Sequence, residues 1–212
     1  EAAAGLAQTF GVVGAALLAL PLARVALSRG RRAALAGGYF LGSLGSIIVI
    51  AGAVYRSLAI VYAGCLFVGV ASAAGLQARY AATDLASANR RARSLSIVVW
   101  GATIGAVAGP NLLDISGRWA QSLGLPPLAG PYLVAAVVCG VTMGLLLVFL
   151  RPDPYRESLR LRRDVDPGVQ RPRIRDGIEH LKNRPRAVLG IGAVAIGHVA
   201  MVMVMVMIMV MT

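Results

Sequence analysis

Few residues in this 212-residue sequence offer chemistry, and the most regular group is a row of methionines near its end. Met stands at every second position from Met201 to Met211. Thioethers at i, i+4 and i+8 of a helix can hold Cu(I), so a copper path is one interpretation. Flexible apolar packing is the favoured interpretation, because a two-residue alternation spreads Met around a helix instead of along one face.

A second group consists of isolated polar residues within long uncharged stretches. His198 titrates near neutral pH and is the candidate for proton movement. Trp100 and Thr103 lie close together in an earlier stretch, and hydrogen bonds between helices are the alternative role for such residues. The sequence has no Ser/His/Asp, paired-carboxylate or phosphate-loop pattern within or beside these stretches, so we expect neither an enzyme nor a metal or cofactor site.

The elements that carry these residues follow from composition. Hydrophobic residues make up 58% of the chain and charged residues 14%, which predicts an all-α, polytopic transmembrane helix bundle. Each uncharged run reaches the 20 or so helical residues that cross a bilayer. The six runs are 2–23, 33–55, 57–78, 94–113, 119–150 and 187–212.

Two of these runs need further interpretation. The run 119–150 is too long for one helix, and its prolines and glycines predict an external loop to about Ala129, followed by a helix over Gly130–Leu150. The methionine segment 198–212 is predicted to be a helix, since a lone strand in lipid leaves its backbone groups unpaired at several kcal/mol each.

Basic residues set the orientation. The connections 24–32, 79–93 and 151–186 hold four, four and eleven of the 21 Lys and Arg residues. Because such residues accumulate in cytoplasmic loops, these three connections are predicted to be cytoplasmic and to contact anionic lipid. The net charge of +12 therefore indicates topology, and nucleic acid is not expected as a partner.

A short basic turn closed by Gly30, Arg31 and Arg32 separates the first two runs. Here the sequence resembles the major facilitator superfamily of secondary transporters, whose loop between helices two and three reads Gly-x-Leu-Ala-Asp-Arg-x-Gly-Arg-Arg. The first glycine, the aspartate and the first arginine of that loop are replaced by Ala23, Leu27 and Ser28. The resemblance thus implies a gating role for the matching residues, without the charge relay of the family's aspartate.

The fourth run carries a second point of resemblance. Gly105, Gly109 and Pro110 match part of the family's antiporter signature, Gly-x-x-x-Gly-Pro-x-x-Gly-Gly, while Leu113 and Asp114 occupy its last slots. With Gly101, these glycines also form a ridge suited to close helix packing, which is the alternative interpretation.

The third run resembles the family's fourth helix. Its small residues predict close packing with neighbouring helices; they are Gly69, Ala71, Ala73, Ala74 and Gly75. Cys65 stands where some proton-coupled members carry an arginine, so that coupling residue is absent. Cys65 and Cys139 are isolated in separate runs, and apolar packing is expected of both instead of a disulfide.

By this registration we expect the chain to be an interior fragment that covers about helices two to seven of twelve. Residues 1–150 are expected to form part of an N-terminal bundle with five helices, 151–186 a cytoplasmic linker, and 187–212 the first helix of the C-terminal bundle. Within the linker, a short amphipathic helix is predicted from Ile174, Ile178 and Leu181.

The resemblance implies transport of a small molecule by alternating access in the plasma membrane. The expected function is a proton-coupled exporter of drug-like or metabolite compounds; an importer of a small solute and a membrane scaffold without transport are the alternatives. The expected partners are the lipid bilayer, a small-molecule substrate and protons. Trp100, Thr103 and His198 are the predicted lining of the substrate cavity.

Overall fold

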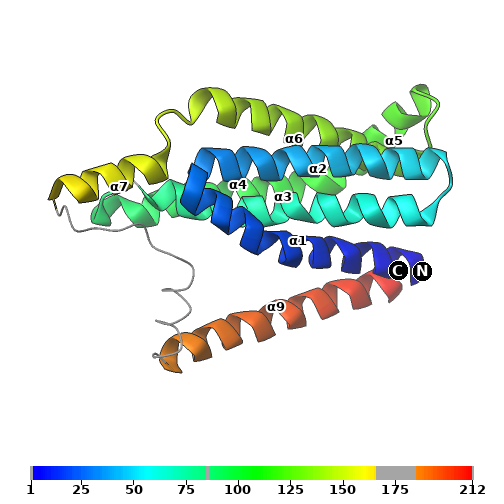
Figure 1. Ribbon diagram of the computed structural model, residues 1–212. Helices are drawn as coiled ribbons and strands as arrows, with labels where there is room; N and C mark the ends of the chain where they lie inside the picture. The colour runs from blue at the N-terminus through cyan, green and yellow to red at the C-terminus, as the bar shows by residue number, and fades with distance from the viewer. Residues whose placement is uncertain (1, 85, 166–184, 212) are drawn as a thin grey trace. The chain divides into compact units, whose positions relative to one another are not determined.

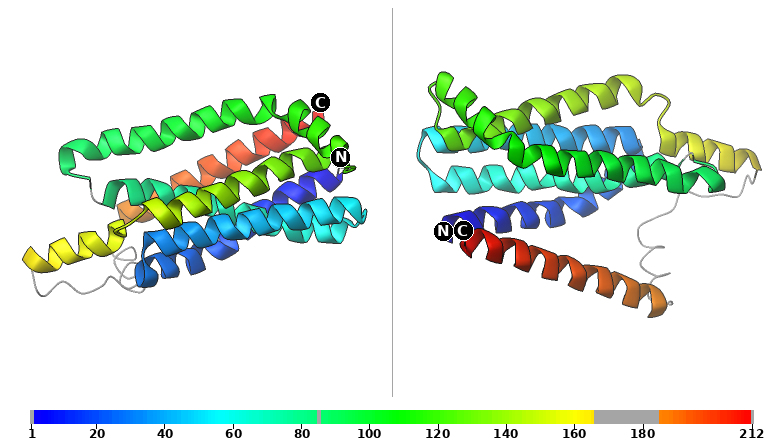
Figure 2. Two further views of the ribbon diagram at one scale, coloured as in Figure 1. Left: turned by 90° about the horizontal axis from the view of Figure 1, so that it is seen from above. Right: turned by 180° about the vertical axis from the view of Figure 1, so that it is seen from behind.

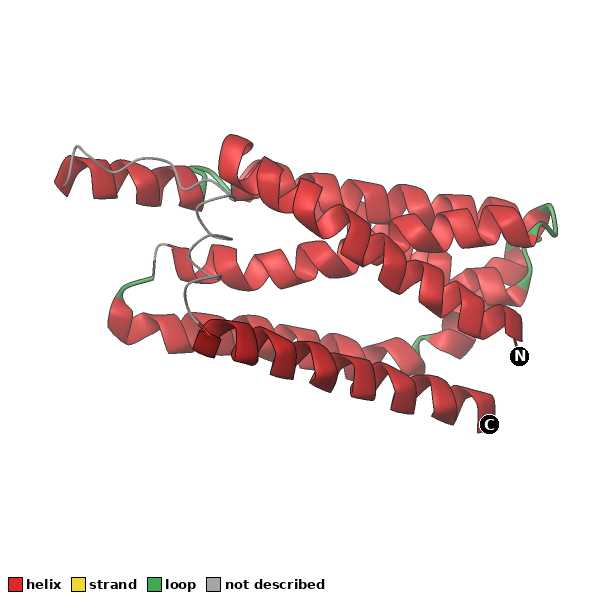
Figure 3. Cartoon of the chain, turned by 60° about the horizontal axis from the view of Figure 1, so that its bottom comes forward, coloured by secondary structure: helices red, strands yellow, loops and turns green. Residues whose placement is uncertain are grey.

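The structure is a computed structural model that describes residues 2–84, 86–165 and 185–211. Throughout this part of the chain the regular structure is helical, and Figure 3 shows the helices joined by loops without a strand. The elements are α1 Ala2–Arg29, α2 Arg31–Val54, α3 Leu58–Asp84, η1 Ala88–Arg90, α4 Arg91–Asn111, α5 Leu113–Ser122, η2 Pro127–Ala129, α6 Gly130–Phe149, α7 Pro154–Val165 and α9 Pro185–Met211.

Long apolar helices dominate the fold, as the composition predicts. Among the described residues, α1, α2, α3, α4 and the stretch that contains α6 are long and apolar enough to cross a membrane. The sixth apolar run is also helical, since α9 extends over 27 residues. The methionine segment is therefore a helix, as expected.

The external loop expected up to about Ala129 is wrong in part. Residues 119–122 form the last turn of α5, and Pro127–Ala129 form a 3-10 turn. The predicted amphipathic helix at Ile174, Ile178 and Leu181 lies outside the described residues.

The described residues within Leu6–Val169 form one compact unit, and α9 belongs to a second unit. Within the first unit, α2 packs against both α3 and α6 (Figures 1 and 2). The long helices of this unit lie side by side. The short helices α5 and α7 lie at its opposite ends (Figure 1).

Close approach of α2 and α3 depends on a row of small residues. A β-carbon on Gly42 would lie 2.6 Å from the β-carbon of Ala71, and one on Gly38 would lie 2.5 Å from that of Ala74. Gly69 faces α1, where a β-carbon would overlap the carbonyl oxygen of Gly11. The small residues of the third run thus pack against other helices, as predicted; the partner glycines of α2, spaced by three to four residues, were not singled out from the sequence.

The apolar core lies near the ends of α1 and α2 that meet at Gly30. Its buried residues are Leu22, Ala26, Ala34, Leu35, Val70 and Ala74. This core fixes the start of α2 against the second half of α3, and so positions the polar residues that follow at the same end of the unit.

Candidate functional site

The tight turn between α1 and α2 is made by Gly30. Its φ of 99° lies in the region that glycine adopts without strain. The α1 helix ends at Arg29 and α2 begins at Arg31, so a single residue connects two long helices. The sequence predicts this reversal.

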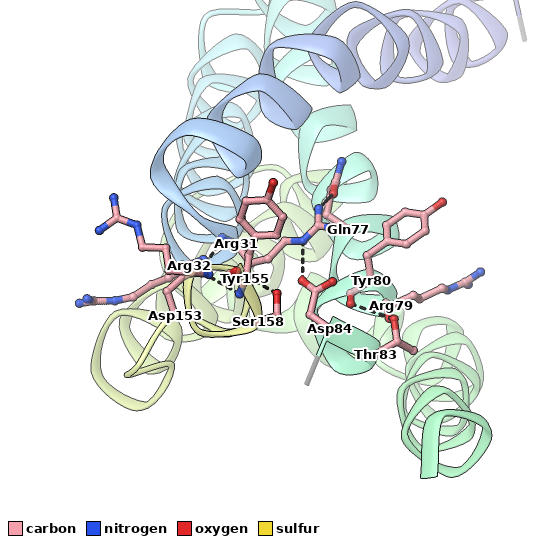
Figure 4. A network of polar contacts seen from close by, with 11 residues as sticks. Arg31, Arg32, Gln77, Arg79, Tyr80, Thr83, Asp84, Asp153, Tyr155 and Ser158 are labelled. Atoms are coloured by element: carbon pink, nitrogen blue, oxygen red, sulfur yellow. Dashed lines mark hydrogen bonds and ion pairs between the residues drawn. The ribbon is translucent and has the colours of Figure 1, made fainter. Parts of the chain in front are cut away.

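Asp153, which precedes α7, caps two helices at once (Figure 4). Its Oδ1 accepts hydrogen bonds from the backbone N–H groups of Arg31, at 3.2 Å, and Tyr155, at 3.1 Å. Its Oδ2 accepts from the backbone N–H of Arg32 at 2.8 Å. First-turn N–H groups have no partner within their own helix, so one carboxylate satisfies and stabilises the starts of both α2 and α7.

The side chain of Arg31 joins α2 to α3. Its Nε lies 2.9 Å from Oδ2 of Asp84, and its Nη1 donates a hydrogen bond to Oε1 of Gln77 at 2.7 Å. The two side chains of the ion pair are 15% and 18% exposed, so water screens the pair less than it would on an open surface. The planar guanidinium serves both acceptors simultaneously, which an ammonium group does not reproduce.

Two tyrosine rings also contact this guanidinium. Its central carbon lies 5.6 Å from the ring centroid of Tyr80 on α3 and 5.6 Å from that of Tyr155 on α7. Both distances fall within the range of cation–π attraction. Arg31 is therefore the point at which α2, α3 and α7 meet, and Figure 4 shows these side chains converging on it.

Arg32 connects the same turn to α6. Its Nη2 donates a hydrogen bond to the backbone carbonyl of Leu147, in the last turn of α6. Basic side chains near a helix C-terminus can satisfy its last carbonyls, and Arg32 does so for α6. We call Arg31, Arg32, Gln77, Tyr80, Asp84, Asp153 and Tyr155 the Arg31 network.

The glycine residues of α4 form no such contacts. Within the described part of the chain, a β-carbon on Gly101, Gly105 or Gly109 would have no neighbour within 4 Å. Pro110 lies inside α4, one residue before the helix ends at Asn111. Gly30, Arg31 and Arg32 thus lie at the turn where α2, α3 and α7 meet. Gly105, Gly109 and Pro110 lie apart from it on α4, where the two glycines have no close neighbour.

The predicted cavity residues lie on two elements. Trp100 on α4 is 71% exposed, and the hydroxyl of Thr103 donates to the carbonyl of Val99 in the same helix at 3.0 Å. Thr103 therefore does not donate this hydroxyl to another helix, whereas Gln77 on α3 accepts a hydrogen bond from Arg31 on α2. His198 belongs to α9, and its side chain lies outside the described part.

Sequence reasoning did not identify Tyr80, Asp84, Asp153 or Tyr155. A local signal exists for Asp153, because an aspartate followed by proline is typical of a helix start. That signal predicts the cap on α7 and not the second cap on α2. Asp84 lies in the basic connection 79–93, and its pairing with Arg31 was not predicted.

Comparison with curated proteins found relatives that are transporters. The uncharacterized MFS-type transporter YdeG of Bacillus subtilis is 36% identical over 205 residues, which cover 95% of this chain and 47% of that protein. The uncharacterized MFS-type transporter YddS of the same species is 42% identical over 154 residues, 73% of this chain and 35% of YddS. Riboflavin transporter RfnT of Brucella anthropi is 30% identical over 147 residues, 68% of this chain and 36% of RfnT.

The chain spans less than half the length of each of these relatives. A search of the solved structures found no significant match. The family model of the Major Facilitator Superfamily matches residues 1–212. Together with the apolar helix bundle, this match shows that the chain belongs to the major facilitator superfamily.

Proposed function

We propose that the protein moves a small molecule across the plasma membrane by alternating access, with the Arg31 network as part of its gate. The observation that carries the proposal is the convergence of α2, α3 and α7 on the Arg31 guanidinium. Asp153 and Tyr155 lie at the start of the proposed linker 151–186, so the network attaches the beginning of that linker to α2 and α3.

The proposed arrangement keeps 1–150 as part of an N-terminal bundle, 151–186 as a cytoplasmic linker, and 187–212 as the first helix of the second bundle. The Arg31 network then faces the cytoplasm. This assignment rests on the four, four and eleven basic residues of 24–32, 79–93 and 151–186.

A gate of this kind needs contacts that break and re-form. Hydrogen bonds to charged groups contribute about 1.5–3 kcal/mol each, and the ion pair is partly screened. A network of such contacts stabilises one state by a few kcal/mol, which is the size of difference that a bound substrate can overcome. The two-helix cap by Asp153 supplies a carboxylate to a loop in which Leu27 replaces the family's aspartate.

For direction, we propose export coupled to protons, because Gly105, Gly109 and Pro110 match part of the antiporter signature. Trp100, Thr103 and His198 are the proposed cavity residues, and His198 the proposed proton-carrying group. Uptake of a flavin-like compound is the alternative, because one relative is a riboflavin transporter.

The test is uptake and efflux by the full-length protein in vesicles with an imposed pH gradient, across a compound panel that includes riboflavin. The proposal expects gradient-driven export of at least one compound, and loss of the gradient dependence in a His198→Ala variant. The matched control is His180→Ala, in the linker sequence. Gradient-driven uptake would support the alternative. Transport that does not respond to the gradient would rule out proton coupling, and unchanged gradient dependence in His198→Ala would rule out His198 as the proton carrier.

A further inference from the structure

The short helix α5 lies in the connection between two of the apolar spans, α4 and α6. It begins at Leu113, directly after α4 ends at Asn111, and the chain enters α6 at Gly130. Figure 1 shows α5 at the end of the first unit opposite α7. Because α4 and α6 are spans, the segment between them lies at the surface away from the Arg31 network.

One side of α5 is already used for packing against protein. Ser116 and Ala120 are buried, and a β-carbon on Gly130 would overlap the carbonyl oxygen of Ser116. The backbone N–H of Leu125 donates to the carbonyl of Ala120 at 2.9 Å. Small residues allow close helix approach in membranes, and those of α5 already pack against the start of α6.

Two stripes can be distinguished on the remaining surface of α5, beside exposed Leu113 at its start and exposed Ser122 at its end. Ile115 and Trp119, one turn apart, are exposed, Trp119 at 66%, and exposed Leu123 follows the helix. The polar stripe is also exposed and consists of Asp114, Arg118 and Gln121. At 100° per residue the centres of the two stripes lie roughly 110° apart, so one can enter lipid while the other faces water.

We infer that α5 is an interfacial helix that inserts Ile115, Trp119 and Leu123 into the lipid leaflet opposite the Arg31 network. Trp favours the boundary between headgroups and acyl chains, where its ring is buried and its N–H remains hydrated. The bilayer around α4 and α6 continues to this helix. Large side chains such as Trp119 and Leu123 suit lipid better than the close approach of another helix, which needs the small residues of the opposite face.

The test is spin-label accessibility in the full-length protein, reconstituted in vesicles after its native cysteines have been replaced. Single cysteines at 115 and 119 report the apolar stripe, and those at 114, 118 and 121 report the polar stripe. Each labelled site is exposed in turn to oxygen, which concentrates in lipid, and to a water-soluble nickel complex.

The inference predicts that positions 115 and 119 collide more with oxygen than with nickel, and that 114, 118 and 121 show the reverse order. Nickel access at 119 equal to that at 118 would place the stripe in water. Low access to both reagents at 119 would place it against another part of the protein. Either result overturns the inference, and neither depends on transport.

A second measurement covers the case in which a label disturbs the helix. In a variant that keeps Trp119 as its sole tryptophan, the experiment compares quenching of its fluorescence by two reagents. One is a lipid brominated near the headgroup, and the other is acrylamide in water. The inference predicts stronger quenching by the brominated lipid. Stronger quenching by acrylamide would overturn it.

Discussion

The carboxylate of Asp153 lies so close to Gly30 that a β-carbon on Gly30 would overlap it. The backbone of Gly30 also has a φ of 99°. Gly30 therefore serves two purposes, a left-handed turn and room for a carboxylate that caps α2 and α7.

Replacing Gly30 with Ala should weaken the fold and the gate together. The backbone of Gly30, at φ 99° and ψ 168°, lies in a region that is essentially restricted to glycine and costs another residue on the order of 1–3 kcal/mol, and the overlap with Asp153 adds to this. We expect a lower thermal unfolding midpoint in detergent and a lower transport rate. Gly37→Ala is the matched control, because a β-carbon on Gly37 meets nothing within 4 Å. Equal midpoints for the two variants would contradict the close approach.

Removal of the double cap should cost more than removal of an ordinary one. A single cap contributes about 0.5–2 kcal/mol, and Asp153→Ala leaves first-turn N–H groups of two helices without their acceptor. Asp153→Asn keeps one acceptor oxygen and should lose less. Unfolding midpoints compare these variants with Asp164→Ala, an exposed aspartate on α7. If Asp153→Ala had the same unfolding midpoint as Asp164→Ala, the cap by Asp153 would not contribute to stability.

Arg31 and Asp84 should be coupled. Arg31→Lys keeps the charge but cannot hold Asp84 and Gln77 in one plane, so we expect reduced transport even in this variant. In a double-mutant cycle of Arg31→Ala with Asp84→Ala, the coupling should be about 1 kcal/mol in unfolding free energy. Arg29, exposed at the end of α1, is the control partner for the cycle. Purely additive effects for Arg31 and Asp84 would rule out their interaction.

The crossing of α1 and α3 should depend on Gly69. Gly69→Ala forces a methyl group into the carbonyl of Gly11, and overpacking of this kind typically costs about 1–3 kcal/mol. Gly75→Ala on the same helix meets an atom at 3.9 Å and should be tolerated. The thermal midpoints of the two variants measure the difference. A reversal of their order would show that the helices do not cross at Gly69.

The spans were predictable because each is a long uncharged run, and a run of that length has few alternatives in a bilayer. The turn at Gly30 was predictable because a glycine stands in a short basic stretch between two apolar runs, so the signal is local in the sequence. The Arg31 network was not, because Asp84 and Asp153 reach Arg31 from distant parts of the sequence and leave no spacing pattern. The helix α5 was missed because its start overlaps the end of an apolar run and its polar and small residues resemble a loop.

We propose that Arg31 acts in the movement of the gate and not in substrate binding. The decisive measurement compares Arg31→Ala with Arg29→Ala in the full-length protein, for both the affinity for a transported compound and the transport rate in vesicles. We expect a greatly reduced rate for Arg31→Ala with nearly unchanged affinity, and no change in either quantity for Arg29→Ala. A normal transport rate in Arg31→Ala would contradict it.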